Sequence, residues 1–253
     1  MTTAPRKIAL ITGVGRRRGI GAAIARSLAA DGWDLGLSYF AEYDTRVNGE
    51  PADVAELAEE LVAAGRRAEL LSADLADPEV PGRLVRDLAD RLGPVNGLVM
   101  SHCESVDSSI LTTTVESFDR HYHVNVRATW LLLKAFAEQD PCPGGPVVAL
   151  TSDHTVHNLP YGATKGALDR LVLAGTHELA DRGVWTNVIN PGPIDTGWMD
   201  DEIRAAGAKQ TPAGHLGEPQ TVGNLVRFLF SDEGSWLRGQ LLYSNGGFAT
   251  PAL

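Results

Sequence analysis

Cysteine, positive charge and long apolar runs are all scarce in this chain of 253 residues. The two cysteines, Cys103 and Cys142, are too few for a disulfide framework and lack metal-ligand spacing, which indicates a reducing, intracellular setting. The formal net charge of -10 argues against nucleic acid or an anionic membrane surface as the main partner. No apolar run approaches the length of a membrane span, and the run at residues 8–11 is too short for a signal peptide. We therefore expect a cytoplasmic protein.

What the chain does have is a regular alternation of strand-like and helix-like segments, with enough hydrophobic residues (43%) for a buried core. Strands are predicted over residues 7–12, 33–40, 67–73, 95–100, 147–151, 184–190 and 240–244. Helices are predicted after residue 21, over 52–64, within 74–92, and over 115–138, 160–181 and 219–230. This alternation predicts an α/β fold in one domain, residues 1–253, with a doubly wound sheet of about seven parallel strands and helices on both faces.

A glycine-rich turn follows the first strand, with glycines at positions 13, 15, 19 and 21 before a helical pattern. Glycines let the backbone approach a pyrophosphate, and the N-terminus of a helix favours its charge. Alone, such a turn is equally compatible with an ordinary tight turn. The strand and helix alternation that continues after it favours the dinucleotide-binding interpretation.

A second pattern, Tyr161-x-x-x-Lys165, stands at the start of the helix predicted over residues 160–181. Side chains four residues apart on a helix share a face, so an ammonium would lie beside a phenol. Moving a phenol pKa from about 10 to about 7 costs roughly 4 kcal/mol. One positive charge at about 4 Å, in the dielectric near a protein surface, supplies about that much. The pair therefore predicts a general acid/base, although the spacing is also common on helices without a catalytic role.

With these and further motifs in order, the sequence resembles the short-chain dehydrogenase/reductase family over almost its whole length. The matching residues are Thr12, Gly13, Gly19, Ile20, Gly21, Asp74, Asn125, Ser152, Tyr161, Lys165, Pro191, Gly192, Pro193, Ile194, Asp195 and Thr196, followed by 217–219 and 246–247. The resemblance implies a Rossmann-type fold and a nucleotide cofactor, which would supply the hydride.

The resemblance implies a catalytic role for four residues. Tyr161 would give or take the substrate proton, and Lys165 would lower the pKa of Tyr161 and bind the nicotinamide ribose. Ser152 would hold the substrate oxygen. Asn125 would complete a proton relay through water to Lys165. Such groups belong at the carboxyl ends of the strands, where open parallel sheets bind their ligands.

The resemblance also implies positions that hold the nucleotide. Asp74 would bind the adenine end, whereas Ile194 and Thr196 would hold the carboxamide. The full predicted set is Gly13, Gly15, Arg18, Gly19, Ile20, Gly21, Tyr39, Asp74, Leu75, Tyr161, Lys165, Pro191, Gly192, Ile194 and Thr196.

The sequence departs from the family pattern in three places. Five residues separate Gly13 from Gly19, more than is usual, and they enlarge the turn. The stretch after the fourth strand, residues 100–103, reads Met-Ser-His-Cys where the family has Asn-Asn-Ala-Gly. Ser152 lies nine residues before Tyr161, closer than usual, so the loop between them is shortened and its pocket reshaped.

The choice of nucleotide depends on the end of the second strand and on the enlarged turn. An enzyme selective for NAD has an acid at the end of that strand, but the position falls on Tyr39, and Asp34 is at the wrong end. Arg18 directly precedes Gly19, where a guanidinium pairs well with a 2′-phosphate. We therefore predict NADP(H) over NAD(H), the alternative being that the arginine triplet is only a solvated loop.

We accordingly predict an NADP(H)-dependent oxidoreductase that interconverts a carbonyl and a secondary alcohol. The alternatives are a 3-oxoacyl-carrier-protein reductase and a non-catalytic dinucleotide-binding regulator on the same fold. The partners expected are a small-molecule carbonyl or alcohol and further copies of the chain, as a homotetramer or homodimer, without nucleic acid or membrane. No metal site is expected from the histidines. Residues 197–217 are predicted to be a lid over the substrate, rather than an ordinary surface helix and loop.

Overall fold

A computed structural model of the chain describes residues 6–197 and 199–249; Trp198, within the predicted lid, lies outside the described residues. Within these residues, seven strands form one parallel sheet in the order β3-β2-β1-β4-β5-β6-β7. In chain order the strands are β1 (Ile8–Thr12), β2 (Asp34–Tyr39), β3 (Ala68–Ser72), β4 (Gly97–Met100), β5 (Gly145–Leu150), β6 (Val184–Asn190) and β7 (Leu241–Tyr243). The predicted doubly wound, Rossmann-type α/β fold is confirmed.

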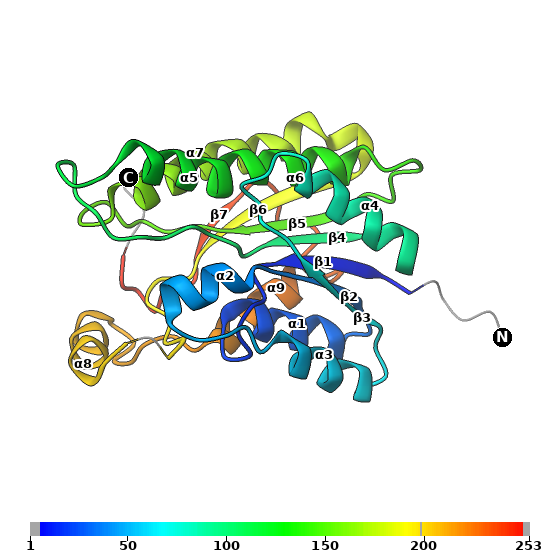
Figure 1. The fold of residues 1–253 in the computed structure, drawn as a ribbon. Helices are drawn as coiled ribbons and strands as arrows, with labels where there is room; N and C mark the ends of the chain where they lie inside the picture. The colour runs from blue at the N-terminus through cyan, green and yellow to red at the C-terminus, as the bar shows by residue number, and fades with distance from the viewer. Residues whose placement is uncertain (1–5, 198, 250–253) are drawn as a thin grey trace.

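Helices cover both faces of the sheet (Figure 1). One layer holds α1 (Ile20–Ala30), α3 (Val54–Ala63) and α9 (Pro219–Leu229), and the other holds α4 (Val80–Leu92), α5 (Val115–Tyr122), α6 (Ala128–Ala137) and α7 (Leu159–Glu178). Each layer packs its own buried cluster of apolar side chains against the sheet. Because both faces are covered, the central strands are continuous apolar runs rather than alternating ones, as in the fully buried β1 and β4.

The strand order reverses direction at β1, which has β2 on one side and β4 on the other. Chain connections leave this point toward opposite edges of the sheet, so a crevice opens beyond the carboxyl ends of the central strands. The residues that follow β1, β4, β5 and β6 therefore meet at one edge.

Four elements differ from the sequence prediction. The helix predicted over 115–138 contains a π-helical turn, His123–Arg127, between α5 and α6. A short helix α2 (Ala41–Tyr43) and a second π-helical turn, Asp44–Asn48, follow β2, where no helix was predicted. Helix α8 (Asp201–Gln210) lies within the predicted lid. In the described part of the chain, no helix is both long enough and apolar enough to cross a membrane.

Candidate active site

A cavity of about 710 Å³ lies at the carboxyl edge of the sheet, where the predicted motifs meet. Most predicted site residues line it: Gly13, Gly15, Gly19, Ile20, Gly21, Tyr39, Asp74, Leu75, Ser152, Tyr161, Pro191, Gly192, Ile194 and Thr196. Asn125 and Lys165 are not among the lining residues and lie buried nearby. Arg18 is not among them either.

The glycine-rich turn forms a hollow that larger residues would fill. Gly13 has a φ of +75°, and a Cβ there would lie 2.6 Å from the backbone oxygen of Ser101. A Cβ on Gly21 would lie 2.7 Å from the oxygen of Gly13. Helix α1 starts here at the N-cap Gly19, which offers no side chain to its amide groups. The hollow therefore presents backbone and a helix N-terminus to an anion.

Tyr161 and Ser152 lie together despite the shortened loop between them. Tyr161 is in the first turn of α7, and Ser152 follows β5 by two residues. Burial raises the pKa of the Tyr161 phenol, whereas a hydrogen bond with the Ser152 hydroxyl lowers it. The reshaped loop thus keeps the Ser152 hydroxyl hydrogen-bonded to Tyr161.

The short loop is held by contacts to the segment after β4. The Asn158 amide donates to Ser105 Oγ at 3.1 Å and to Asp107 Oδ1 at 2.7 Å. The backbone N–H of Leu159 donates to the oxygen of Ser108 at 3.0 Å. His157, within the loop, has a φ of +64°, the left-handed region that non-glycine residues rarely adopt. These contacts fix a tight path from Ser152 to the start of α7.

Lys165 lies beside Tyr161, and its role in lowering the pKa of Tyr161 stays a prediction. Its side chain is buried, and Nζ donates to the backbone oxygen of Leu150 at 2.7 Å. Nζ lies 5.5 Å from the centre of the Tyr161 ring. Because burial dominates the balance, the pKa of Tyr161 is raised rather than lowered toward neutrality. Burial also lowers the pKa of Lys165 itself.

Asn125 lies in the π-helical turn and is fully buried. Its Oδ1 accepts from the backbone N–H of Glu104 at 2.7 Å, and its Nδ2 donates to the Glu104 oxygen and to Thr164 Oγ1, both at 2.9 Å. The side chain therefore joins the segment after β4 to α7, just before Lys165. A relay from Asn125 through water to Lys165 stays a prediction.

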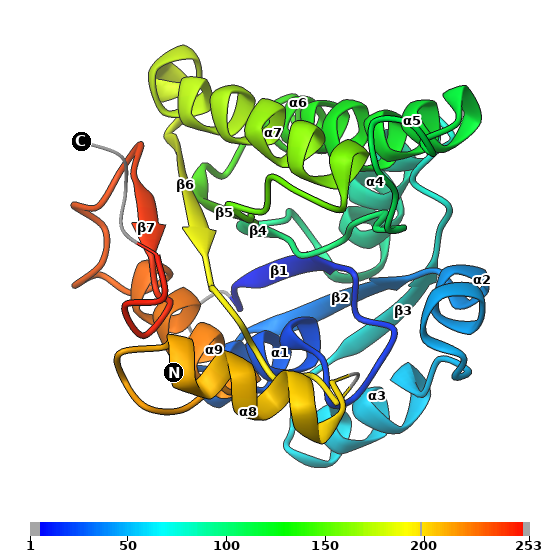
Figure 2. The same cartoon turned by 90° about the vertical axis from the view of Figure 1, so that its left-hand side faces the viewer.

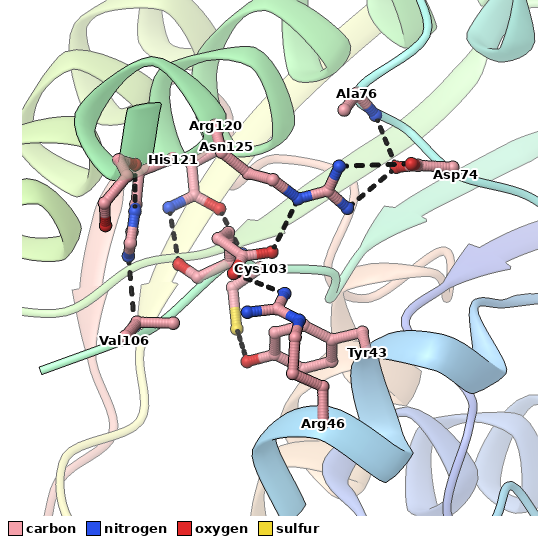
Figure 3. A network of polar contacts seen from close by, with 11 residues as sticks. Tyr43, Arg46, Asp74, Ala76, Cys103, Val106, Arg120, His121 and Asn125 are labelled. Atoms are coloured by element: carbon pink, nitrogen blue, oxygen red, sulfur yellow. Dashed lines mark hydrogen bonds and ion pairs between the residues drawn. The ribbon is translucent and has the colours of Figure 1, made fainter. Parts of the chain in front are cut away.

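Asp74 belongs to a chain of charges that sequence reasoning did not find (Figure 3). The Arg120 guanidinium donates to both Asp74 oxygens, at 3.0 and 3.1 Å, and to Glu104 Oε2 at 3.3 Å. Arg46 donates to Glu104 Oε1 at 2.6 Å. Glu104 is buried, and two arginines neutralise it. Arg120 could not be recognised from sequence, since its partners are far away along the chain.

The altered stretch after β4 places two unusual side chains at the cavity. Cys103 Sγ lies 3.8 Å from the hydroxyl of Tyr43, on α2 (Figure 3). His102 is buried, with Nε2 donating to Val124 O at 3.1 Å and Nδ1 lying 2.7 Å from Thr12 Oγ1. Burial lowers the pKa of His102 to about 3, so the ring is neutral and Nδ1 accepts the threonine hydroxyl. Within residues 6–197 and 199–249, no three His, Cys, Asp or Glu side chains form a metal-binding group.

The three arginines of the enlarged turn, residues 16–18, lie in different surroundings. Arg18 is not among the residues that line the cavity and pairs with Glu50, so its contact with the 2′-phosphate stays a prediction. Arg16 lines the cavity instead, with only 16% of its side chain exposed, and its Nε lies 3.9 Å from Asp44 Oδ1.

The comparisons agree with this geometry. The family model described as "Enoyl-(Acyl carrier protein) reductase" matches residues 13–249. The chain is 34% identical to an uncharacterized oxidoreductase, YjdA, of Bacillus subtilis, over 98% of this chain and 99% of that one. It is 33% identical to an NADPH-dependent aldehyde reductase-like protein of Arabidopsis thaliana, over 96% and 94% of the two chains.

A solved structure extends the similarity to three dimensions. A short chain dehydrogenase from Burkholderia cenocepacia, in complex with NADP, matches with a TM-score of 0.85 and 29% identity, over 97% of this chain and 99% of that one. Fold, site and sequence together define an oxidoreductase of the dinucleotide-binding class. The chain belongs to the short-chain dehydrogenase/reductase family.

Proposed function

We propose that the protein is an NADP(H)-dependent reductase that converts a carbonyl into an alcohol. The observation that carries this proposal is the Ser152–Tyr161 pair, which faces the same cavity as the glycine hollow at the carboxyl edge of the sheet. The Ser152–Tyr161 pair suits a substrate oxygen, and the glycine hollow suits a dinucleotide phosphate.

The residues present fit a dinucleotide. The hollow at Gly13 and Gly21 accepts no side chain, and the amides of α1 start at its rim. Asp74 and Leu75 line the same cavity at one end, and Ile194 with Thr196 lines it at the other. The dinucleotide, when bound, would supply the hydride.

NADP(H) is favoured because of the residues near the turn. No acid stands at the end of β2, where Tyr39 lines the cavity, and Arg16 faces inward. Arginine matches a phosphate with a planar set of donors. The Burkholderia structure holds NADP, and the Arabidopsis relative is named as NADPH-dependent.

The chain's own part in the reaction is proton transfer. With its pKa raised by burial, Tyr161 is protonated at neutral pH and can donate to the oxygen of a carbonyl substrate. Ser152, hydrogen-bonded to Tyr161, is placed to hold the same oxygen. Asn125 joins α7 to the segment after β4, and Lys165 joins α7 to the end of β5. A raised pKa suits reduction better than oxidation.

The substrate half of the cavity has an apolar wall. Its apolar side chains are Pro193, Met199, Ile203, Leu216 and Phe248. This lining favours a carbonyl compound with an apolar body. The acids at the start of α8, Asp200 to Glu202, give no basic surface for an acidic carrier protein, which speaks against a 3-oxoacyl-carrier-protein reductase.

The test is NADPH oxidation with a panel of apolar aldehydes and ketones. Tyr161→Phe should lower the rate by about 10²- to 10⁴-fold, the usual contribution of a general acid. NADPH binding should be unchanged, because the ring remains. The wild-type rate of reduction should be constant between about pH 6 and about pH 9, where a phenol with a raised pKa stays protonated. If the protein binds NADPH but no turnover that requires Tyr161 is detected, the result would instead indicate the non-catalytic regulator.

A further inference from the structure

The Arg18 guanidinium lies flat against the backbone of Gly197, at the start of the predicted lid. A Cβ built on Gly197 would lie 2.8 Å from Arg18 Cζ, 2.8 Å from Nη1 and 2.9 Å from Nε. Three nearly equal distances mean that the face of the guanidinium, rather than its edge, covers this position. Gly197 has a φ of +86°, a conformation that favours glycine, and a side chain there would displace the tip of Arg18.

The same guanidinium is held from a third segment. Its Nη2 lies 2.7 Å from both carboxylate oxygens of Glu50, in the loop that leads to α3. Arg18 therefore joins the glycine-rich turn, the loop before α3 and the start of the lid. Arg18 is not among the residues that line the cavity.

Helix α8, which follows Gly197, has little else to hold it. None of its residues is buried, and it projects beyond the carboxyl edge of the sheet, away from both helix layers (Figure 1, Figure 2). Arg204 ties α8 back to Asp195 at 2.8 Å and to the Met199 oxygen at 2.7 Å. The inner side of this segment contributes Met199, Ile203, Ala206, Gly207 and Gln210 to the cavity.

We propose that Arg18 is a positioning residue that clasps Gly197 to the glycine-rich turn, so that a dinucleotide bound in the turn holds α8 over the substrate. The proposal rests on the proposed function, since it assumes a dinucleotide in the turn and a substrate under α8. The enlarged turn then provides two separate contacts: Arg16 faces the nucleotide, and Arg18 faces the lid.

The test compares Arg18→Ala with Arg17→Ala, which removes the same charge from the same turn. Arg17 pairs instead with Glu56 and Glu60 on α3. Trypsin cleavage after Arg204 and Lys209, followed by mass spectrometry, reports on α8 directly. NADPH should slow this cleavage in the wild type and in Arg17→Ala, but not in Arg18→Ala.

Kinetic constants should separate Arg18→Ala from the wild type and Arg17→Ala in the same way. Arg18→Ala should raise the KM for the carbonyl substrate by about fivefold, the low end of typical coupling between sites, with the Kd for NADPH unchanged. Gly197→Ala should raise KM in the wild type and raise it less in Arg18→Ala, because its backbone strain is present in both and only the clash with Arg18 is lost.

Two results would overturn the clasp. One is protection of α8 by NADPH that is equal in Arg18→Ala and Arg17→Ala. The other is a selective loss of NADPH affinity in Arg18→Ala with KM unchanged, which would return Arg18 to the 2′-phosphate. Either result leaves the proposed function standing, whereas failure of the wild type to bind NADPH would remove the proposed function itself.

Discussion

Burial raises the pKa of the Tyr161 phenol, whereas its hydrogen bond with Ser152 lowers that pKa. The helical spacing in the sequence predicted Lys165 as a neighbour of Tyr161, and Lys165 Nζ lies 5.5 Å from the centre of its ring, whereas Ser152 was implied by the family resemblance. The spacing could not predict the direction of the pKa shift. That direction depends on how much of the phenol the rest of the fold removes from water, which no local spacing encodes.

The arginine triplet shows a similar limit. Sequence indicated that a basic residue in the turn meets the nucleotide, and Arg16 does line the cavity. Arg18, which the sequence favoured, pairs with Glu50 and is not among the lining residues, so its assignment to the 2′-phosphate stays a prediction. The enlarged turn also brings Arg16 beside Asp44, from a π-helical turn that was not predicted.

His102 gives a prediction for the pH dependence of stability. Burial lowers its pKa to about 3 from an ordinary 6.5, so only the unfolded chain binds a proton there between these pH values. Its contribution to the free energy of unfolding is complete above about pH 6.5 and falls by about 1.4 kcal/mol per pH unit as the pH drops.

Urea unfolding at pH 7 and pH 5 measures this contribution. His102→Gln should be less stable than the wild type at pH 7 but should lose about 2 kcal/mol less on going to pH 5. The exposed His215→Gln serves as a matched control for the loss of an imidazole. An equal loss in His102→Gln and the wild type would show that His102 is not held neutral.

At the scale of elements, the strands and long helices followed from the sequence, because each is an apolar run with a period that only one element type fits. The short α2, the two π-helical turns and α8 did not follow. A helix of three residues shows no periodicity, and α8 has no buried face to mark it. These unpredicted elements supply Tyr43, Asp44 and Asn125, and α8 adds Ile203, Ala206, Gly207 and Gln210 to the cavity lining.

The π-helical turn in the long helix can be tested through Asn125. Asn125→Ala removes all three of its side-chain hydrogen bonds and leaves the buried N–H of Glu104 without its acceptor. We expect a loss of about 3 kcal/mol in the free energy of unfolding, measured with urea.

Thr129→Val, at the start of α6 directly after the turn, is the matched control. It removes a single hydrogen bond, from Thr129 Oγ1 to the Asn125 oxygen at 2.9 Å, and should cost about 1 kcal/mol. If Asn125→Ala cost no more than Thr129→Val, Asn125 would not be the link between the segment after β4 and α7.

At the scale of the whole molecule, the reversal of strand order at β1 explains why distant motifs form one site. The glycine turn, the segment after β4, Ser152 and residues 191–196 each follow a strand that ends at the same edge. The alternation of strands and helices predicted the parallel sheet and its edge, and the family resemblance indicated which residues belong there. Neither could predict the ion pairs between them, such as Arg120 with Asp74, which depend on how the helices pack.

Assembly stays a prediction. Leu168 and Val172 are buried in the core, whereas the large side chains exposed along α5 and α6 include Phe118, Tyr122 and Trp130. An apolar face of this kind is typical of contact between copies of a chain, as the expected homodimer or homotetramer requires.

The most direct measurement is calorimetric binding of NADPH and NADH to the wild type, Arg16→Ala and Arg17→Ala. We predict that the wild type binds NADPH more tightly than NADH. Arg16→Ala should weaken NADPH binding by about tenfold or more, the loss of a charge-assisted contact, and leave NADH binding little changed. Arg17→Ala should behave as the wild type. Binding of neither nucleotide would contradict the account, because the hollow at Gly13 and Gly21 would then hold no pyrophosphate.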